Sequence, residues 1–583
     1  MMLQALIAYA ERENLGEADF ESVGVRWLIP LDERGRLAGG PIPLFDNSDD
    51  KKPKPKRMLR PKSDPDFVSH GRSYFLCDSL ERSLVFVEEA SKREKRKINQ
   101  CYFIGLLDAA ANDCQGEAEP LRLLAAFLRD GTQLEAVHAQ LVTSKAKASE
   151  NVTFSVAGHN LIESRELKEW WRRRSKRERD QQKSETAVCL ASGKYGPVCR
   201  TTGFIKLLGE DTKLISFNKE CPAFESFGLS QAANAPIALD SEVNFRAALN
   251  ALIEKSRQQR LVFNNTVHLH WTRKPLDYDP IDILANADEK AVSSLLKSVH
   301  TGQEPADFDD NAYYAMSLSG NGARVVVRDW LEMSVPEVRG HIARWFENLA
   351  IITPDGAGVK RDFKFFALLF GMVRKELDEL SPQISTQLLY SALRGTPIPQ
   401  SALAAALKRQ QIEPRGEDGM RNAVVLARIA LIKACLIRSP ISQNQNEQPK
   451  VNCMSETLNC ESVDPAYLCG RLFAVFDRLQ YLAQGSVNAG VVDRYYASAC
   501  VTPALVMGRL FRNAQFHLAK THEDSAVNAS KDFEAIATAL GNEFPVTLDL
   551  EGQGRFGLGY YHQKAEFRRR RQGVDDSSTT AAK

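Results

Sequence analysis

The chain has 583 residues, of which 43% are hydrophobic and 26% charged, and its formal net charge is +2. This length predicts about three or four structural units, and the composition is typical of a globular protein rather than of an intrinsically disordered one. No run of about 18 apolar residues occurs, so we expect no membrane span and no membrane partner. Because the net charge is close to zero, the kind of partner has to be inferred from local clusters of charge.

The amino-terminal residues "MMLQALIAYAERENLG" have the pattern of a short amphipathic helix rather than of a signal peptide. The eleven cysteines are scattered and never spaced as C-x-x-C, and the closest three, Cys453, Cys460 and Cys469, have no histidine nearby. Zinc sites need sets of Cys and His at short spacings. We therefore expect reduced thiols in a cytoplasmic protein, with no metal and no cofactor.

Short β-like segments fill the first part of the chain. They are rich in β-branched and aromatic residues and end at Gly, Pro, Asn or Asp, as at 23–32, 151–158 and 261–271. Helical patterns fall between them, as at 244–259. This alternation predicts a mixed α/β domain over residues 1–334.

A basic segment precedes one of these strands. Residues 50–60, "DKKPKPKRMLR", hold six cations and one acid, which favours an anionic partner. Lys62 and Arg72 then flank a loop that leads to Tyr74, Phe75 and, after the strand, Ser79. Cations of this kind neutralise phosphates, while aromatic and hydroxyl side chains read or wedge bases. The residues alone allow a second interpretation, in which the basic segment is a solvated linker and Phe75 is an ordinary core residue.

A second basic cluster, "SRELKEWWRRRSKRERDQQK", predicts a helix with Trp170 and Trp171 at its centre. We expect one tryptophan to pack in the core and the other to contact a sugar or a protein partner. The run Arg172, Arg173 and Arg174 suits a track of phosphates, and equally a protein interface rich in arginine.

Signatures of catalysis are missing from the sequence. No P-loop, G-x-G-x-x-G, H-E-x-x-H or G-x-S-x-G motif occurs. His268 and His270 share a strand face without a third ligand nearby, which favours a half-exposed structural pair. Asp307, Asp309 and Asp310 lack the strand-borne carboxylate that two-metal chemistry needs. We expect a non-catalytic binding protein; the alternatives are a metal-dependent nuclease that uses 307–310 and a pure assembly scaffold.

Helical patterns follow one another from residue 335 onward. They predict a helical domain over 335–438, a polar linker over 439–453, a carboxyl-terminal helical bundle over 454–572 and a disordered tail over 573–583. In the bundle, "PAYLCGRLFAVFDRLQYLAQ" is one of the clearest helices. The expected fold class is α+β, with a mixed α/β amino-terminal region followed by a helical region and the bundle.

Several blocks together resemble the large subunit of the type I-C CRISPR surveillance complex, Cascade. Among them are "YFLCDSLERSLVF", "SFNKECPAFESFG" and "DRYYASACVTPALVMGRLFRNAQFHLAK", in the order that the family has them. The resemblance runs from residue 2 to about residue 520.

The resemblance implies a non-catalytic role in antiviral defence. In such complexes a guide RNA (crRNA) pairs with the target strand of double-stranded DNA, and protein reads the short flanking PAM. The large subunit would recognise the PAM, promote R-loop formation and hold the displaced strand. Its expected partners are the Cascade backbone subunits, the 5′-handle-binding subunit, the small subunits and the helicase-nuclease.

The resemblance also implies residue roles near the PAM. The segment 60–79 would lie at the PAM duplex, with Lys62 and Arg72 on phosphates and Tyr74, Phe75 and Ser79 toward the grooves. Relatives often carry Asn where Tyr74 and Ser79 stand, so a hydroxyl or an aromatic wedge would replace amide readout here.

The carboxyl-terminal bundle resembles the small subunit, which type I-C systems make by internal translation. Met454 is the expected internal start, and Met420 is the second candidate. The expected contacts to the nucleic-acid backbone in the bundle are Arg471, Arg478, Arg494, Arg509, Arg512, His517 and Lys520. The run Arg568–Arg571 would add a contact or form part of a soluble tail.

Overall fold

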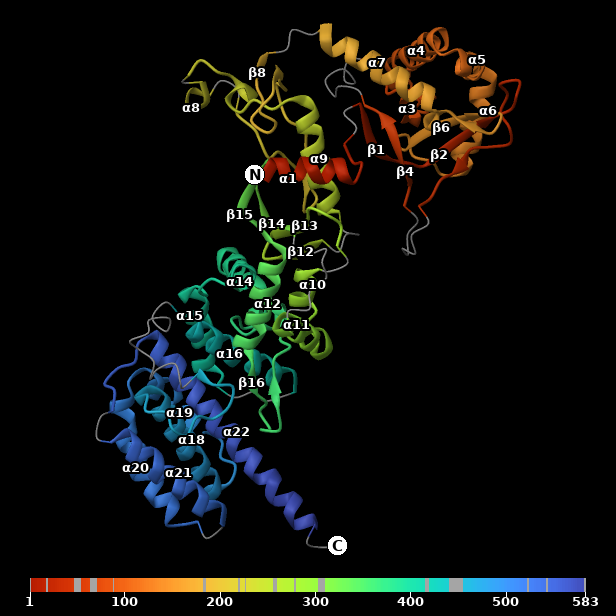
Figure 1. Ribbon diagram of the computed structural model, residues 1–583. Coiled ribbons are helices and arrows are strands. Elements are labelled where there is room, and N and C mark those ends of the chain that lie inside the picture. The colour runs from red at the N-terminus through yellow and green to blue at the C-terminus, as the bar shows by residue number, and fades with distance from the viewer. Residues whose placement is uncertain are drawn as a thin grey trace. The chain divides into compact units, whose positions relative to one another are not determined.

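The computed structural model is shown in Figure 1. The residues that it describes are 2–16, 19–46, 54–62, 71–87, 89–181, 185–218, 221–225, 227–254, 259–276, 279–301, 310–414, 419–439, 454–521, 524–541 and 544–580. Two compact units divide the chain: an amino-terminal unit of Met1–Ile205 and Lys213–Ala251, and a carboxy-terminal unit of Lys206–Thr212 and Leu252–Lys583. Strands and helices mix in the first part and helices dominate the last, so the predicted α+β class is confirmed.

The main sheet of the amino-terminal unit has the strand order β3-β2-β6-β5, with β7 paired to β6. Its strands are β2 (Trp27–Leu31), β3 (Ile42–Pro43), β5 (Cys77–Ser79), β6 (Asn151–Val156) and β7 (His159–Asn160). Strand β2 runs parallel to β6, and β5 runs antiparallel to it. A separate antiparallel ladder pairs β1 (Phe20–Val25) with β4 (Lys56–Pro61). The basic segment 50–60 therefore ends in a paired strand rather than in a free linker.

Helices pack against this sheet through apolar stripes. The helices that begin in this unit are α1 (Met2–Arg12), α3 (Leu80–Ser83), α4 (Ala90–Asp113), α5 (Ala118–Arg129), α6 (Gly131–Thr143), α7 (Arg165–Gln181), α8 (Pro222–Glu225) and α9 (Leu239–Ile253). Helix α5 buries Leu121, Leu124 and Phe127 in the core that also contains Phe154 of β6. Two short ladders follow: β8 (Thr186–Val188) pairs with β9 (Tyr195–Pro197) in this unit, and β10 (Ile205–Leu207) pairs with β11 (Glu210–Thr212), which belong almost entirely to the carboxy-terminal unit.

The main part of the carboxy-terminal unit begins with an antiparallel sheet in which the strands lie side by side in the order in which they follow along the chain. Its strands are β12 (Arg260–Phe263), β13 (Thr266–Thr272), β14 (Ala312–Asn321) and β15 (Arg324–Ser334). Residues 261–271, expected as one strand, instead form a hairpin. Asn264 and Asn265 have φ angles of 47° and 54°. Asparagine tolerates this left-handed region, and a two-residue type I′ hairpin needs two such residues.

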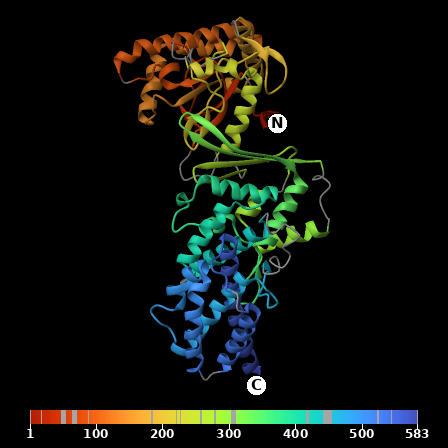
Figure 2. The same ribbon diagram turned by 90° about the vertical axis from the view of Figure 1, so that its left-hand side faces the viewer.

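Helices make up most of the rest of this unit, and Figure 2 shows them beneath the sheet. They are α10 (Pro280–Ala285), α11 (Glu289–Thr301), α12 (Val335–Leu349), α13 (Phe365–Phe370), α14 (Pro382–Arg394), α15 (Gln400–Ile412), α16 (Gly419–Ile437), α18 (Pro465–Gln484), α19 (Val491–Val501), α20 (Pro503–Leu518), α21 (Asp524–Leu540) and α22 (Leu550–Thr580). A small ladder pairs β16 (Ile351–Ile352) with β17 (Val359–Lys360). Helix α22 includes most of the tail 573–583, for which the composition predicts disorder.

One apolar core runs through the carboxy-terminal unit. It joins Tyr313 of the sheet to Leu389 of α14, Leu431 of α16 and Leu558 of α22, and it includes Met454. Helix α12 begins directly after the sheet, with Ser334 as its N-cap. The sheet, the helices of 335–438 and the bundle are therefore packed together, although the sequence pattern divides them at 334 and 453. Residues 440–453 of the expected linker lie outside the described residues.

Candidate nucleic-acid interface

Lys62 follows β4 at one end of the expected PAM loop, whose residues 63–70 lie outside the described part of the chain. Its backbone N–H donates a hydrogen bond of 2.8 Å to the carbonyl of Asp19. Burial lowers the pKa of the Lys62 ammonium, and the nearby positive charge of Arg246 lowers it further. The carboxylates of Glu242 and Glu21 oppose this effect, and a phosphate would act on Lys62 in the same direction as they do.

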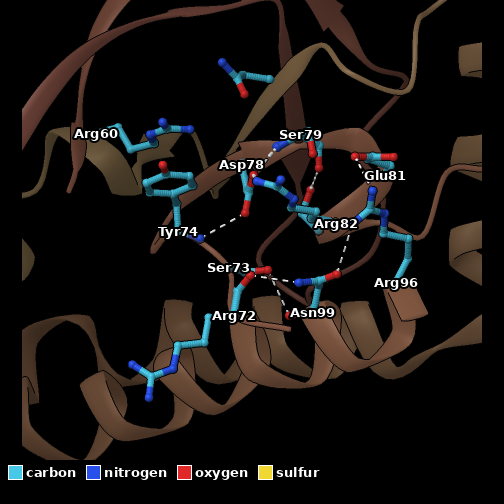
Figure 3. Close-up of polar contacts among 12 residues, drawn as sticks. Arg60, Arg72, Ser73, Tyr74, Asp78, Ser79, Glu81, Arg82, Arg96 and Asn99 are labelled. Atoms are coloured by element: carbon cyan, nitrogen blue, oxygen red, sulfur yellow. Dashed lines mark hydrogen bonds and ion pairs between the residues drawn. The ribbon is translucent and has the colours of Figure 1, made fainter. Parts of the chain in front are cut away.

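Arg72 lies at the other end of that loop. Its carbonyl accepts a hydrogen bond of 2.8 Å from the Asn99 amide, and its guanidinium lies 5.8 Å from the ring centroid of Tyr102. Figure 3 shows the Arg72 side chain directed away from the neighbouring Asp78 group. Asn99 of α4 thus fixes the backbone of Arg72, while the charged end extends over the helix.

Tyr74 is held between a buried carboxylate and a stacked arginine (Figure 3). Asp78, 1% exposed, accepts hydrogen bonds from the backbone N–H of Tyr74 at 2.9 Å and of Ser79 at 2.7 Å. The Arg60 guanidinium lies 3.5 Å from the centroid of the Tyr74 ring and pairs with Glu21 at 2.5 Å. The ring is half-buried, so part of it remains open to a ligand. Sequence reasoning missed Asp78; its place at the end of a strand, four residues after Tyr74, is the signal that could have identified it.

Two other residues expected at the grooves are buried instead. Phe75 is 0% exposed and stacks on Trp171, with ring centroids 5.6 Å apart. Ser79 is 8% exposed, and its Oγ has no hydrogen-bond partner among the described residues. The expectation that Phe75 and Ser79 face a groove is therefore corrected. Phe75, two residues before β5, packs on Trp170 and Trp171 of α7, and Ser79 lies in β5 itself, which pairs with the central strand β6.

Helix α7 also differs from the expectation. Trp170 and Trp171 are both buried, at 3% and 4% exposed, so neither tryptophan remains free for a sugar or a partner. Arg172 lies over the Phe20 ring at 5.2 Å, and Arg174 pairs with Glu178 at 3.0 Å. Arg173 is exposed and makes no ion pair with a described residue. Of the three arginines, Arg173 is the one best placed for a phosphate.

In the bundle, the expected contacts separate into buried and exposed groups. Arg471 is 4% exposed and donates hydrogen bonds to Gln563 Oε1 at 3.0 Å and to the Asn459 carbonyl at 3.2 Å. The expectation that Arg471 contacts nucleic acid is therefore corrected, because Arg471 lies on the face of α18 that packs against α22. Arg478 is half-exposed and lies 5.8 Å from the Tyr481 ring centroid. The exposed members of the set are Arg494, Arg509, Arg512 and Lys520.

The other basic residues expected to contact nucleic acid, His517 and the carboxyl-terminal arginine run, are partly buried or paired. Burial and the charge of Lys520 lower the pKa of His517. In the carboxyl-terminal run, Arg569 and Arg570 pair with Glu566 at 2.8 and 2.7 Å, and Arg568 donates a hydrogen bond of 3.1 Å to the Pro354 carbonyl. Arg570 also pairs with Asp532 of α21 at 2.8 Å, so Arg568 and Arg570 tie α22 to other parts of the unit, whereas the ion pair of Arg569 lies within the helix.

Arg471→Ala is expected to lower the free energy of unfolding by about 2–3 kcal/mol, because it leaves buried hydrogen-bond partners unsatisfied. The salt dependence of nucleic-acid binding should stay unchanged. Urea unfolding and binding titrations measure the two effects. Arg494→Ala, at an exposed position of the same bundle, is the matched control and should leave stability unchanged. A shallower salt dependence in Arg471→Ala alone would contradict the structural role.

The two histidines of β13 are buried rather than half-exposed, at 1% for His268 and 3% for His270. His268 Nδ1 lies 2.6 Å from Ser317 Oγ, and His270 Nδ1 lies 3.3 Å from Asp279. Burial lowers the pKa of His268 to about 3, so its ring is neutral. Both rings pack on buried aromatic side chains, His268 on Phe263 with ring centroids 4.1 Å apart and His270 on Tyr313 with centroids 6.3 Å apart.

Metal ligands do not cluster in the part of the chain that the structure describes: no group of three or more His, Cys, Asp or Glu residues could hold an ion there. Asp307 and Asp309 lie outside the described residues. Asp310 pairs with Lys274 at 3.3 Å. Within the same described residues, no helix is both long and apolar enough to cross a membrane.

Met454 is 5% exposed and belongs to the core of the carboxy-terminal unit. Met420 lies in α16, which is itself part of that core. A product that starts at Met454 would contain α18 to α22 but lack α16, against which α22 packs: a Cβ added at Gly554 of α22 would lie 3.2 Å from the Leu436 side chain.

Comparison with known proteins places the chain among the CRISPR-associated proteins. A family model described as CRISPR-associated protein (Cas_Csd1) matches residues 6–568, and the chain belongs to this family. No curated protein matches the chain.

Proposed function

We propose that the chain is the large, non-catalytic subunit of a cytoplasmic type I-C Cascade complex. In this role it recognises the PAM in double-stranded DNA, promotes R-loop formation, holds the displaced strand and recruits the helicase-nuclease for antiviral defence. A guide RNA supplies the sequence specificity by base pairing. The backbone subunits, the 5′-handle-binding subunit and the small subunits complete the assembly. Membership of the CRISPR-associated family supports this proposal.

The observation that carries the proposal is the arrangement of cations around Tyr74. Strand β4 supplies exposed Lys56 and Arg57 and ends beside Lys62. Arg60 of the same strand stacks on the half-buried Tyr74 ring. Cations beside a preformed, partly open aromatic ring suit a DNA duplex whose phosphates are neutralised while a base step is contacted. Because Phe75 and Ser79 are buried, Tyr74 is the remaining candidate for the contact with bases.

The test uses the assembled guide complex and duplex targets with and without a PAM. A variant with Lys62→Ala, Arg72→Ala and Tyr74→Ala is expected to lose its preference for PAM DNA. The slope of log K against log salt should shrink by roughly 0.9 for each lost phosphate contact, or about 1.8 for the two cations. Electrophoretic mobility shifts at several salt concentrations measure both quantities.

Lys290→Ala with Lys297→Ala is the matched control, because it removes two exposed cations from α11 in the other unit. We expect this control to keep its PAM preference. Unchanged affinity, slope and preference in the triple variant would favour a pure assembly scaffold instead. Mg²⁺-dependent cleavage of DNA by the chain alone, lost in Asp310→Ala, would favour the nuclease and contradict the non-catalytic role.

A further inference from the structure

Helix α20 has an exposed face on which cations and large apolar side chains alternate. Leu505, Arg509, Arg512 and Phe516 follow at intervals of four, three and four residues, which places them on one side of the helix. Leu505 is 80% and Phe516 65% exposed, and both arginines are exposed. Lys520, also exposed, extends the row by four residues past the helix end. These five residues are called the α20 stripe.

The opposite side of α20 anchors it in the bundle. Val506, Met507, Leu510 and Ala514 are buried in the core that α20 shares with α18 and α19. Figure 1 shows α20 at the outer edge of the bundle. The exposure of the stripe is therefore a property of a fully packed helix rather than of a loosely attached one.

No acidic residue occurs from Pro503 to Thr521. Among the residues that the structure describes, no carboxylate pairs with Arg509 or Arg512. The adjacent helix α21, in contrast, carries Asp532 and Glu534 beside Lys531. The positive charge of the stripe is thus uncompensated, which favours an anionic ligand.

The exposed Phe516 ring indicates which class of anion the stripe would bind. Single exposed apolar residues are common, but this ring lies between Arg512 and Lys520 on the same face. Aromatic rings among cations form the platforms on which single-stranded nucleic acids stack their bases. A duplex keeps its bases paired and stacked, so it has no free base for such a ring.

The dimensions of the stripe agree with a short length of strand. Arg509 and Lys520 are eleven residues apart, which corresponds to about 16 Å along a helix axis. A stacked strand advances about 3.4 Å per nucleotide, so the part of the stripe from Arg509 to Lys520 spans about five nucleotides. One base on Phe516 and phosphates on the three cations fit within that length.

We infer that the α20 stripe binds the displaced DNA strand of the R-loop, with Phe516 stacking on a base and Arg509, Arg512 and Lys520 contacting phosphates. The inference rests on the proposed function and extends it to a particular helix face and a particular ring. Because every base has a π-face, the contact is independent of base sequence.

Three substitutions at Phe516 separate base stacking from apolar docking. Phe516→Ala removes the ring, Phe516→Leu keeps apolar area without a π-face, and Phe516→Trp keeps a larger π-face. The full chain is titrated with a fluorescein-labelled oligothymidylate by anisotropy. We expect Ala and Leu to weaken binding about tenfold and Trp to retain it, consistent with the measured effect of removing one stacking residue. Arg509→Ala with Arg512→Ala should reduce the salt slope by roughly 1.4, at about 0.7 per phosphate of a single strand.

Val527→Ala and Lys531→Ala on α21 are the matched controls, because both positions are exposed in the same bundle. They should bind like the wild type. If the Leu variant bound as tightly as the wild type, the stacking would be overturned, because apolar area without a π-face would then be sufficient. Unchanged binding by every stripe variant would overturn the site altogether.

The assembled guide complex connects the stripe to the displaced strand. A 2-aminopurine in that strand should be less protected from quencher in the Phe516→Ala complex than in the wild type. Suppose that the wild-type complex forms an R-loop and that the 2-aminopurine is equally protected in the wild-type and Phe516→Ala complexes. This result would overturn the inference and leave the proposed function intact. A wild-type complex that forms no R-loop on PAM DNA would overturn the proposed function, while the oligothymidylate titration would still decide whether the stripe binds single strands.

Discussion

Gly559→Ala is expected to destabilise the carboxyl-terminal bundle strongly. Helices α18 and α22 cross so closely that a Cβ at Gly559 would lie 2.2 Å from the backbone carbonyl oxygen of Tyr467, and one at Gly470 would lie 1.9 Å from that of Phe556. Backbone atoms cannot rotate away as a side chain can, so the helices have to separate. Overpacking of this kind costs about 1–3 kcal/mol and occasionally more. Because two glycines meet at one crossing, we expect a loss of about 3 kcal/mol.

Urea unfolding of the full chain, followed by circular dichroism, measures this loss. Gly508→Ala on α20 is the matched control, since an added Cβ there meets nothing within 4 Å. A glycine in a helix is less favourable than alanine by about 0.5–1 kcal/mol, so this control should be slightly more stable than the wild type. A Gly559→Ala protein as stable as the control would show that the two helices can move apart without cost.

Asp78→Ala is expected to destabilise the amino-terminal unit and to weaken PAM binding. The variant leaves the backbone N–H groups of Tyr74 and Ser79 without their carboxylate acceptor. Hydrogen bonds to a charged group contribute about 1.5–3 kcal/mol each, and part of this is offset by the cost of burying the carboxylate, so we expect a net loss of about 2–4 kcal/mol. Without the acceptor, the Tyr74 ring is no longer held under Arg60. Urea unfolding and mobility shifts of the assembled complex measure the two effects.

Asp78→Asn distinguishes the hydrogen bonds from the charge. Burial is the main cause that raises the pKa of Asp78 above its ordinary value of 3.8. Because the folded pKa lies above the unfolded one, ionisation is less favourable in the folded state. The free energy of unfolding should therefore fall as the pH rises from 3.8 toward the folded pKa. The Asn variant keeps an acceptor and should lose this pH dependence. A DNA affinity in Asp78→Ala equal to that of the wild type would contradict the positioning of Tyr74.

Local patterns were sufficient where each helix carries its own signals. The segment expected to form a helix at 465–484 is α18, because Asp464 caps it, Pro465 begins it and Gly485 ends it with a φ of 68°. They were insufficient at 261–271, where two adjacent asparagines turn the chain and the apolar residues on both sides look like one strand. The predicted exposure of Phe75 and Arg471 was wrong for another reason: the residues that bury them come from distant parts of the chain.

Composition, periodicity and ordered motifs thus establish the α+β class, many of the helices and the basic segments, since these depend on residues close together in sequence. Which cations are available to a ligand depends on packing. Arg428 and Lys433 of α16, and Arg438 directly after it, are all at most 4% exposed and donate hydrogen bonds to backbone carbonyls, whereas Arg509 and Arg512 of α20 are exposed. Both helices are basic in sequence. The difference arises because α16 is enclosed by other helices while α20 has a neighbour on one side only, and burial of a cation is tolerated where carbonyl oxygens solvate it.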